Sequence, residues 1–296
     1  DRVNLATAAD AIKRELALSN TQLGVLQSAF GYPYLLFQIF GGWVGDRFGP
    51  RRTLFQCGLI WAAATILTGF SGGLVSLFFC RLLVGIGEGA TFPVATRAMQ
   101  NWTPLGRRGF AQGITHAFAR LGNAVTPPIV AWLIALVAWR GSFIMLGCVS
   151  LVWVAVWFLY FRDNPSDHPA ITRVELDALP NRGVPEKKTR PRVPWAALTR
   201  RMIPVTIVYF CYGWTLWLYL TWLPSYFLHE YQYDLKKSAL FTSAVFFAGV
   251  VGDYLGGEVS DRILHRTGSL QSARRNMVMI GFTGSFVCLL PVFLTH

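Results

Sequence analysis

The chain has 296 residues, of which 53% are hydrophobic and only 14% carry a charge, and its mean hydropathy is +0.40. One soluble core could not bury that much apolar surface, so the composition excludes an ordinary water-soluble globular protein. Aromatic residues make up 15% of the chain, as expected of helices that face lipid and anchor at its interfaces. The sequence therefore predicts a chain embedded in a lipid bilayer.

The formal net charge of +12 is carried mainly by Lys and Arg residues in short connections between apolar segments. This placement is typical of the cytoplasmic loops of membrane proteins, and it argues against a nucleic-acid partner, which would need a basic stripe interleaved with aromatics. The five cysteines have no CxxC spacing and lie mostly in apolar runs, so neither a disulfide nor a metal site is expected. No cofactor is expected either.

Apolar runs of about 20 residues, the length of helix that crosses a bilayer core, recur along the whole chain. The first begins at Ser19, three residues before Gln22, which is the spacing of a capping box. The pattern predicts an all-α, polytopic membrane protein. The expected crossings cover residues 21–45, 54–73, 75–98, 109–134, 141–161, 202–228, 238–259 and 276–294.

Lys and Arg residues are divided unequally between alternate connections, with eighteen on one side and five on the other. Because cytoplasmic loops carry the excess of positive charge, the side with eighteen is predicted to be cytoplasmic. Nine of the eighteen lie in a Pro-rich, charged stretch, which predicts a cytoplasmic linker between two helical halves. The expected division is an N-terminal half at residues 1–162, the linker at 163–200, and part of a C-terminal half at 201–296.

Both ends of the sequence fall inside expected helices. No initiator Met, signal sequence or apolar lead-in precedes the opening DRVNLATAA, and the last apolar run has barely finished at His296. The sequence is therefore expected to be a fragment that is truncated at both ends.

Two connections share a Gly-rich motif that ends in Asp-Arg, GGWVGDR at residues 41–47 and GGEVSDR at residues 256–262. Each follows a crossing on the predicted cytoplasmic side. Glycines allow two helix ends to approach closely, and the Asp can hold an Arg or the positive end of a neighbouring helix. We expect these motifs to form a latch that closes and opens one face of the protein. Its expected members are Gly42, Asp46, Arg47, Arg51, Gly257, Asp261 and Arg262.

The stretch GGWVGDRFGPRR resembles the signature loop between the second and third helices of major facilitator transporters, and the second copy resembles its counterpart in the other half. The resemblance implies two six-helix halves related by pseudo-symmetry, with a substrate site between them near the middle of the membrane. It also implies that residue 1 lies late in the first helix and that the chain ends in or near the ninth.

Ionisable side chains inside an apolar run need a partner, a cavity or a functional role, because burying them in a bilayer is costly. Arg81 and Glu88 are seven residues apart, so two helical turns place both on one face, while Asp1 and Arg2 are adjacent. A structural ion pair is the alternative, although such pairs contribute little stability. Because Arg binds carboxylates bidentately and a buried carboxylate can carry a proton, we expect an anion and protons as the cargo.

The stretches DRVNLA, GYPYLLFQIFGGWVGDR, RLLVGIGEGATFP and LWLYLTWLPSYF resemble the anion:cation symporter family, which includes galactonate, hexuronate and phthalate carriers. The resemblance implies that Asp1 and Glu88 are proton-linked carboxylates. It also implies that Arg2 and Arg81 bind or steer the substrate carboxylate, and that Tyr34 lines the site from the second helix.

The fifth helix departs from the pattern of galactonate-like carriers, which place there a Gln that binds sugar hydroxyls. The matching position is Ala119, beside the cation Arg120, so the substrate is expected to differ from a polyol acid. Arg120 either binds a second carboxylate or phosphate, or pairs with Glu88 or Asp1. His116, four residues earlier, could face the same cavity, although a structural role is the commoner one. For Asp253, near the cytoplasmic end of a crossing, a structural role is expected.

The sequence contains no Ser-His-Asp or Cys-His set and no metal-ligand cluster at sensible positions, so no enzyme activity is expected. The expected function is secondary transport of a small organic anion with protons by alternating access, by a monomer in the plasma membrane, the inner membrane of a bacterium. An exchanger of organic anions or phosphate esters without proton coupling is the alternative. A transporter-like sensor would need a partner-binding element in the linker, whose Pro-rich composition shows none.

Overall fold

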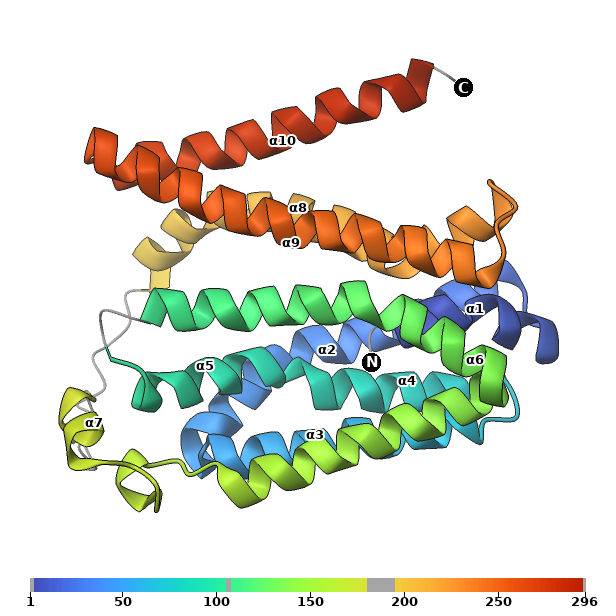
Figure 1. The fold of residues 1–296 in the computed structure, drawn as a ribbon, viewed down its shortest axis with the longest axis horizontal. Coiled ribbons are helices and arrows are strands. Elements are labelled where there is room, and N and C mark those ends of the chain that lie inside the picture. The colour runs from blue at the N-terminus through green and yellow to red at the C-terminus, as the bar shows by residue number, and fades with distance from the viewer. Residues whose placement is uncertain (1–2, 105–107, 180–194, 295–296) are drawn as a thin grey trace.

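The computed structural model describes residues 3–104, 108–179 and 195–294, and every regular element in these ranges is helical. Long helices run side by side, with α8, α9 and α10 stacked on one side of the first six (Figure 1). The all-α prediction is therefore confirmed. The helices are α1 (Asn4–Glu15), α2 (Asn20–Phe48), α3 (Pro50–Gly69), α4 (Leu74–Gly89), α5 (Thr91–Trp102), α6 (Arg108–Tyr160), α7 (Arg173–Ala178), α8 (Trp195–His229), α9 (Leu235–Thr267) and α10 (Leu270–Leu294).

Each of the eight apolar runs overlaps one or two of these helices, although the run 54–73 extends past the end of α3 at Gly69. In the described part of the chain, four helical stretches are long and apolar enough to cross a membrane by length and composition. These stretches support the prediction of a polytopic membrane protein. They are Leu74–Trp102, Ala111–Tyr160, Ala196–His229 and Leu235–Gly252.

The helix connections gather at two opposite ends of the bundle (Figure 1). The turns from α1 to α2, α3 to α4 and α8 to α9 lie at one end, and α7 lies at the other with the turns from α2 to α3 and α9 to α10. This alternation matches the two sets of connections that were compared for charge. We call the α7 end the cytoplasmic end, following the distribution of Lys and Arg, and the opposite end the outer end.

Local sequence explains where α2 and α3 begin. The Ser19 hydroxyl accepts a hydrogen bond from the Gln22 backbone N–H at 3.1 Å, and the Gln22 side chain accepts one from the Ser19 N–H at 2.8 Å. The predicted capping box is thus confirmed. Between α2 and α3, Gly49 takes a φ of 86°, which side chains with a Cβ rarely adopt, and Pro50 occupies the first turn of α3.

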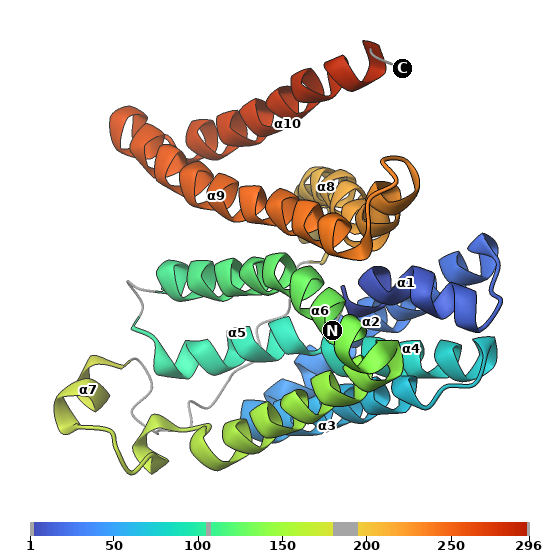
Figure 2. The ribbon, with the colours of Figure 1, turned by 45° about the vertical axis from the view of Figure 1, so that its right-hand side comes forward.

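Helix α6 contains two of the predicted crossings, joined by a sharp bend. Val137 and Ala138 leave helical geometry, with φ of −130° and 56°. Pro127 and Pro128 lie in the first arm of this helix, but the break lies ten residues later, between the two apolar runs. The first arm packs along α9, and the second turns away to pack along α3 (Figure 2).

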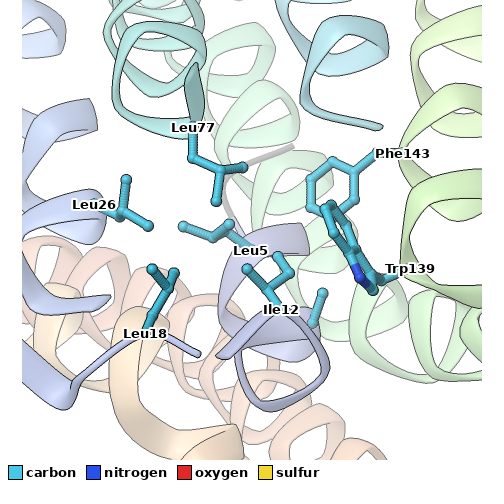
Figure 3. Packing of buried hydrophobic residues seen from close by; sticks show 8 residues of the cluster. Leu5, Ile12, Leu18, Leu26, Leu77, Trp139 and Phe143 are labelled. Atoms are coloured by element: carbon cyan, nitrogen blue, oxygen red, sulfur yellow. The ribbon is translucent and has the colours of Figure 1, made fainter. Parts of the chain in front are cut away.

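The first two turns of helix α1 lie buried inside the bundle, whereas Arg14 and Glu15 at its end are exposed. Residues 3 to 9 are all buried, including the polar Asn4 and Thr7. Towards the outer end, α1 joins an apolar cluster with α2, α4 and the bend of α6 (Figure 3). The cluster consists of Leu5, Ala8, Ile12, Leu18, Leu26, Leu77, Trp139 and Phe143.

Candidate functional site

The predicted charged pair lies on α4, well inside the bundle. The residue Arg81 is only 4% exposed and Glu88 only 8%. Both residues belong to α4 and lie two helical turns apart, the spacing that predicts a shared face. The structure places both groups in the interior of the bundle.

Three glycines let α4 fit between its neighbours. A Cβ on Gly85 would lie 2.4 Å from the carbonyl oxygen of Phe30 in α2, and one on Gly89 would lie 2.7 Å from that of Tyr34. A Cβ on Gly87 would lie 2.7 Å from the carbonyl oxygen of Cys57 in α3. The glycine-rich run is thus a packing device, which brings the α4 backbone against two helices at once.

An aromatic cluster covers Arg81. The guanidinium carbon lies 4.9 Å from the centre of the Phe30 ring, within the range of a cation–π interaction. The Phe30 ring stacks on Tyr34 at 5.3 Å, and Trp217 from α8 contacts both rings, at 5.7 and 5.9 Å. Tyr34 is buried and contributes to this cluster from α2, the helix that the resemblance implied.

The Nε atom of Arg81 is buried without a hydrogen-bond partner among the described residues. A buried charged donor that lacks an acceptor destabilises a protein, so its retention calls for a further ligand. A carboxylate is the group whose two oxygens fit the planar guanidinium best. The arrangement around Arg81 is therefore suited to hold a small anion beside a second ionisable group, Glu88.

A second cation faces a cavity between α6, α8, α9 and α10. Arg120 donates a hydrogen bond from Nη2 to the hydroxyl of Tyr212, and its guanidinium carbon lies 5.8 Å from the Tyr212 ring centre. Both residues line a cavity of about 610 Å³. The cavity is large enough for a small organic anion.

A small apolar cluster lies between the aromatic rings that cover Arg81 and the cavity that Arg120 lines. Val3, Ala124, Leu220 and Phe246 are buried together, and Trp217 packs against them. Four helices, α1, α6, α8 and α9, meet at this point. Asp1 and Arg2 directly precede Val3 in sequence and lie outside the described residues, so their predicted roles stay predictions.

The first copy of the repeated motif lies at the cytoplasmic end. A carboxylate oxygen of Asp46 is 3.1 Å from Nε of Arg97 in α5. Arg47 lies over the ring of Trp43 at 5.6 Å, and Gly42 faces Pro93 of α5. The Asp thus holds an Arg, as we expected, and the partner comes from the neighbouring α5.

The cation Arg51 has a different set of contacts. Its Nε and Nη2 atoms donate to the Phe158 carbonyl oxygen at 2.9 and 2.6 Å, and its backbone N–H donates to Asp163 at 2.7 Å. These contacts fasten the start of α3 to the end of α6. The second copy of the motif, Gly257, Asp261 and Arg262, is in α9 with Asp253, but these side chains lie outside the described residues.

Sequence reasoning gave no role to Arg97, Tyr212 or Trp217. The signal for Arg97 was present, because a cation at the cytoplasmic end of a crossing can meet the Asp of the motif. Nothing local marks Tyr212 or Trp217, since α8 carries many aromatic residues. His116 is exposed and stacks on Phe92 of α5 at 5.2 Å, and it is not among the described residues that line the Arg120 cavity.

Among the described residues, no group of three or more His, Cys, Asp or Glu side chains could hold a metal ion.

Comparison with known proteins identifies relatives that carry organic anions. The chain is 50% identical over its full length to the probable sulfoacetate transporter of Cupriavidus necator, and it covers 69% of that protein. It is 33% identical to a D-galactonate transporter of Escherichia coli O6:H1, over 95% of the chain and 68% of the relative. It is 30% identical to a hexuronate transporter of Bacillus subtilis, over 96% of the chain and 68% of the relative.

The fold also matches a solved structure, a bacterial homologue of the human lysosomal transporter Spinster. The TM-score is 0.64 at 19% identity, over 90% of this chain and 60% of that one. The sequence model of the Major Facilitator Superfamily matches residues 1–296. The relatives are transporters of this family's anion-carrying type, and the chain is similar to them along nearly its whole length. This chain is therefore a multi-pass membrane protein that belongs to the Major Facilitator Superfamily.

Proposed function

We propose that the chain is the greater part of a secondary transporter that moves a small organic anion together with protons by alternating access. The observation that carries this proposal is the buried Arg81, whose Nε has no hydrogen-bond partner among the described residues and which lies two helical turns from the buried Glu88 in α4. A cation suits the carboxylate of a substrate, and a carboxylic side chain suits a proton. Because both groups lie in one helix, binding of the anion at one can affect binding of the proton at the other.

The substrate class follows from the relatives together with the departure in α6. The relatives are named for sulfoacetate, D-galactonate and hexuronate, which all contain a carboxylate. The Gln that the resemblance assigns to sugar hydroxyls is replaced by Ala119. We therefore propose that the substrate is a short sulfonated carboxylate such as sulfoacetate and not a polyol acid.

The residue roles that the sequence predicted form part of this proposal. Arg81 and Arg2 bind or steer the carboxylate, with Tyr34 and the adjoining aromatic rings forming the wall of the site. Glu88 and Asp1 exchange the protons. Position and burial support the roles of Arg81, Glu88 and Tyr34.

The latch at the cytoplasmic end is also a proposal. The ion pair between Asp46 and Arg97 supports it, because a contact between partly exposed side chains can break and re-form at little cost. Gly42, Arg47 and Arg51 belong to the first copy, and Gly257, Asp261 and Arg262 belong to the second. We place the two halves at residues 1–162 and 201–296, in a monomer of the bacterial plasma membrane.

The proposal is tested by uptake into proteoliposomes that contain the whole protein. Labelled sulfoacetate, galactonate and an aromatic acid are offered with and without an inward proton gradient. We expect the gradient to drive accumulation, with sulfoacetate accumulating most. Exchange that ignores the gradient would replace this proposal with an anion exchanger, and the absence of flux for every organic anion would reject it.

Matched variants separate the role of Arg81 from mere folding. Arg81→Lys keeps the charge but loses the bidentate geometry, so we expect a higher KM, by roughly tenfold or more, from the loss of one charge-assisted hydrogen bond. Arg201→Gln removes an exposed cation from α8 and should leave KM within about twofold. An unchanged KM for Arg81→Lys would show that Arg81 does not touch the substrate.

A further inference from the structure

We infer that Arg120 and Tyr212 form a second anion subsite, which holds the transported anion on the cytoplasmic side of Trp217. The inference rests on the proposed function, because it concerns the route of the same anion. Arg120 then binds the anion at a different position along the transport pathway from Arg81. The ligand class is a small organic oxyanion, a carboxylate or a sulfonate.

The positions of the residues along the helices separate the two subsites. Trp217 contacts Phe30, which lies under the Arg81 guanidinium. Tyr212 is five residues nearer than Trp217 to the cytoplasmic start of α8. At a rise of 1.5 Å per residue, this places Tyr212 about 8 Å closer to the cytoplasmic end.

Helix α6 gives an independent estimate of the same depth. Ala124 packs with Val3, Leu220 and Trp217, and Arg120 is four residues nearer to the cytoplasmic start of α6. The offset is about 6 Å. Both helices therefore place the Arg120 and Tyr212 pair on the cytoplasmic side of the aromatic cluster that covers Arg81.

The chemistry of the cavity suits an oxyanion. Arg120 is the one charged side chain among the described residues that line it. Polar side chains from three helices also line the cavity, namely Asn123 of α6, Ser285 of α10, and Thr215 of α8, whose hydroxyl donates to the Cys211 carbonyl oxygen. A guanidinium with neighbouring hydroxyl and amide donors is the usual surrounding of a bound carboxylate or sulfonate. The remaining lining is largely aromatic and aliphatic, which keeps the anion's contacts with Arg120 partly shielded from water.

The sidedness of transport tests this subsite. The whole protein is reconstituted, and labelled sulfoacetate is offered either to the outer face or to the cytoplasmic face in membrane vesicles of known orientation. We expect Arg120→Gln to raise the KM measured from the cytoplasmic face about tenfold, the effect of losing a charge-assisted contact. The KM from the outer face should change by less than about twofold, because Arg81 receives the anion first. Equal changes on both faces, or no change on either, would overturn the inference.

Two control variants keep the interpretation specific. Arg201→Gln removes one positive charge from the same end of α8 but outside the cavity, and Tyr209→Phe removes an exposed hydroxyl one turn from Tyr212. Neither should alter the KM from either face. Tyr212→Phe should raise the cytoplasmic KM by a smaller factor, about two- to fivefold, because it removes a neutral hydrogen-bonding group.

A binding measurement distinguishes failure of the subsite from failure of the proposed function. Inorganic sulfate is titrated into the purified whole protein, and the melting temperature is recorded. Wild type and Arg81→Gln should both be stabilised by sulfate, whereas adding Arg120→Gln to Arg81→Gln should remove most of the remaining shift. This result would support the subsite even if sulfoacetate were not transported. Equal shifts in Arg81→Gln and in the double variant would overturn it.

Discussion

At the cytoplasmic end, Asp163 and Arg51 fasten α6 to α3, whereas at the outer end Asp10 approaches His229 and so joins α1 to α8. The first contact involves backbone groups and lies within the first six helices. The second is a pair of side chains, 3.2 Å apart, and the His229 side chain is 62% exposed. A transporter that alternates must keep its helical units intact while contacts between them change. The stronger contacts should therefore lie within the unit, and the weaker one between α1 and α8.

The largest expected effect comes from Gly49→Ala at the cytoplasmic end. The new Cβ would lie 2.4 Å from Oδ2 of Asp163, at a φ of 86° that favours glycine. We expect a loss of about 3 kcal/mol in the free energy of unfolding, seen as a lower melting temperature in detergent. Gly268→Ala is the matched control, since its φ is 64° but nothing lies near the new Cβ. Equal losses in the two variants would mean that the Asp163 contact is unimportant.

Asp163→Ala should have the next largest effect. It removes the acceptor for the Arg51 backbone N–H in the first turn of α3, as the loss of a helix cap would. The expected loss is about 1 to 2 kcal/mol. Asp167→Ala, in the same segment, removes a carboxylate bonded only to its neighbours Asn164 and Ser166 among the described residues, and should cost little. A melting temperature of Asp163→Ala no lower than that of Asp167→Ala would contradict the prediction.

Glu15→Gln at the outer end should have a smaller effect that depends on pH. Hydrogen bonds from Arg140 and Trp139 hold the pKa of the Glu15 carboxyl below its usual value. A lowered pKa means that the contact stabilises the fold above the unfolded-state pKa and is lost as the pH falls through the folded-state pKa. We expect wild type to exceed Glu15→Gln by less than about 1 kcal/mol at pH 7, because the pair is partly exposed. Melting curves should converge below about pH 4, and a gap that widened in acid would refute the assignment.

The smallest effect on stability is expected for His229→Ala, within about 0.5 kcal/mol, because the His229 side chain of this pair is 62% exposed. The loss should instead loosen the contact between α1 and α8. Hydrogen exchange in the turn from α8 to α9 should therefore become faster. Lys13→Gln removes a contact from α1 to Asn20 at the start of α2 and should leave that exchange unchanged. Equal exchange rates in both variants would show that His229 does not join these helices.

The fold could largely be predicted because hydrophobic length and charge are local signals. The capping box at Ser19 and the apolar runs gave the helices directly, and the spacing of Arg81 and Glu88 gave their shared face. Helix α8 begins at Trp195, seven residues before the expected crossing, because WAALTRR forms helix without being apolar enough to span a membrane. Hydrophobic composition therefore detects the membrane crossing in α8 but not the polar helical turns that precede it.

Contacts between distant segments could not be predicted from the sequence. Trp217 meets Phe30 across nearly two hundred residues, and Tyr212 meets Arg120 in the same way, from a helix in which aromatic residues are common. The pairing of Asp46 with Arg97 was not predicted from the sequence. Arg97 also donates a hydrogen bond to Asn101, one helical turn further along α5, and that local contact alone could account for the cation. Choosing among many aromatic or charged candidates requires the packing of whole helices, which no local pattern provides.

The central claim is that Glu88 couples proton movement to the anion held by Arg81, and transport by Glu88→Gln in proteoliposomes tests it most directly. Labelled sulfoacetate accumulation under an inward proton gradient is measured beside exchange of labelled for unlabelled anion without a gradient. The account predicts that wild type does both, whereas Glu88→Gln exchanges the anion but does not accumulate it, which also shows that the variant is folded. Gradient-driven accumulation by Glu88→Gln at the wild-type level would contradict the account.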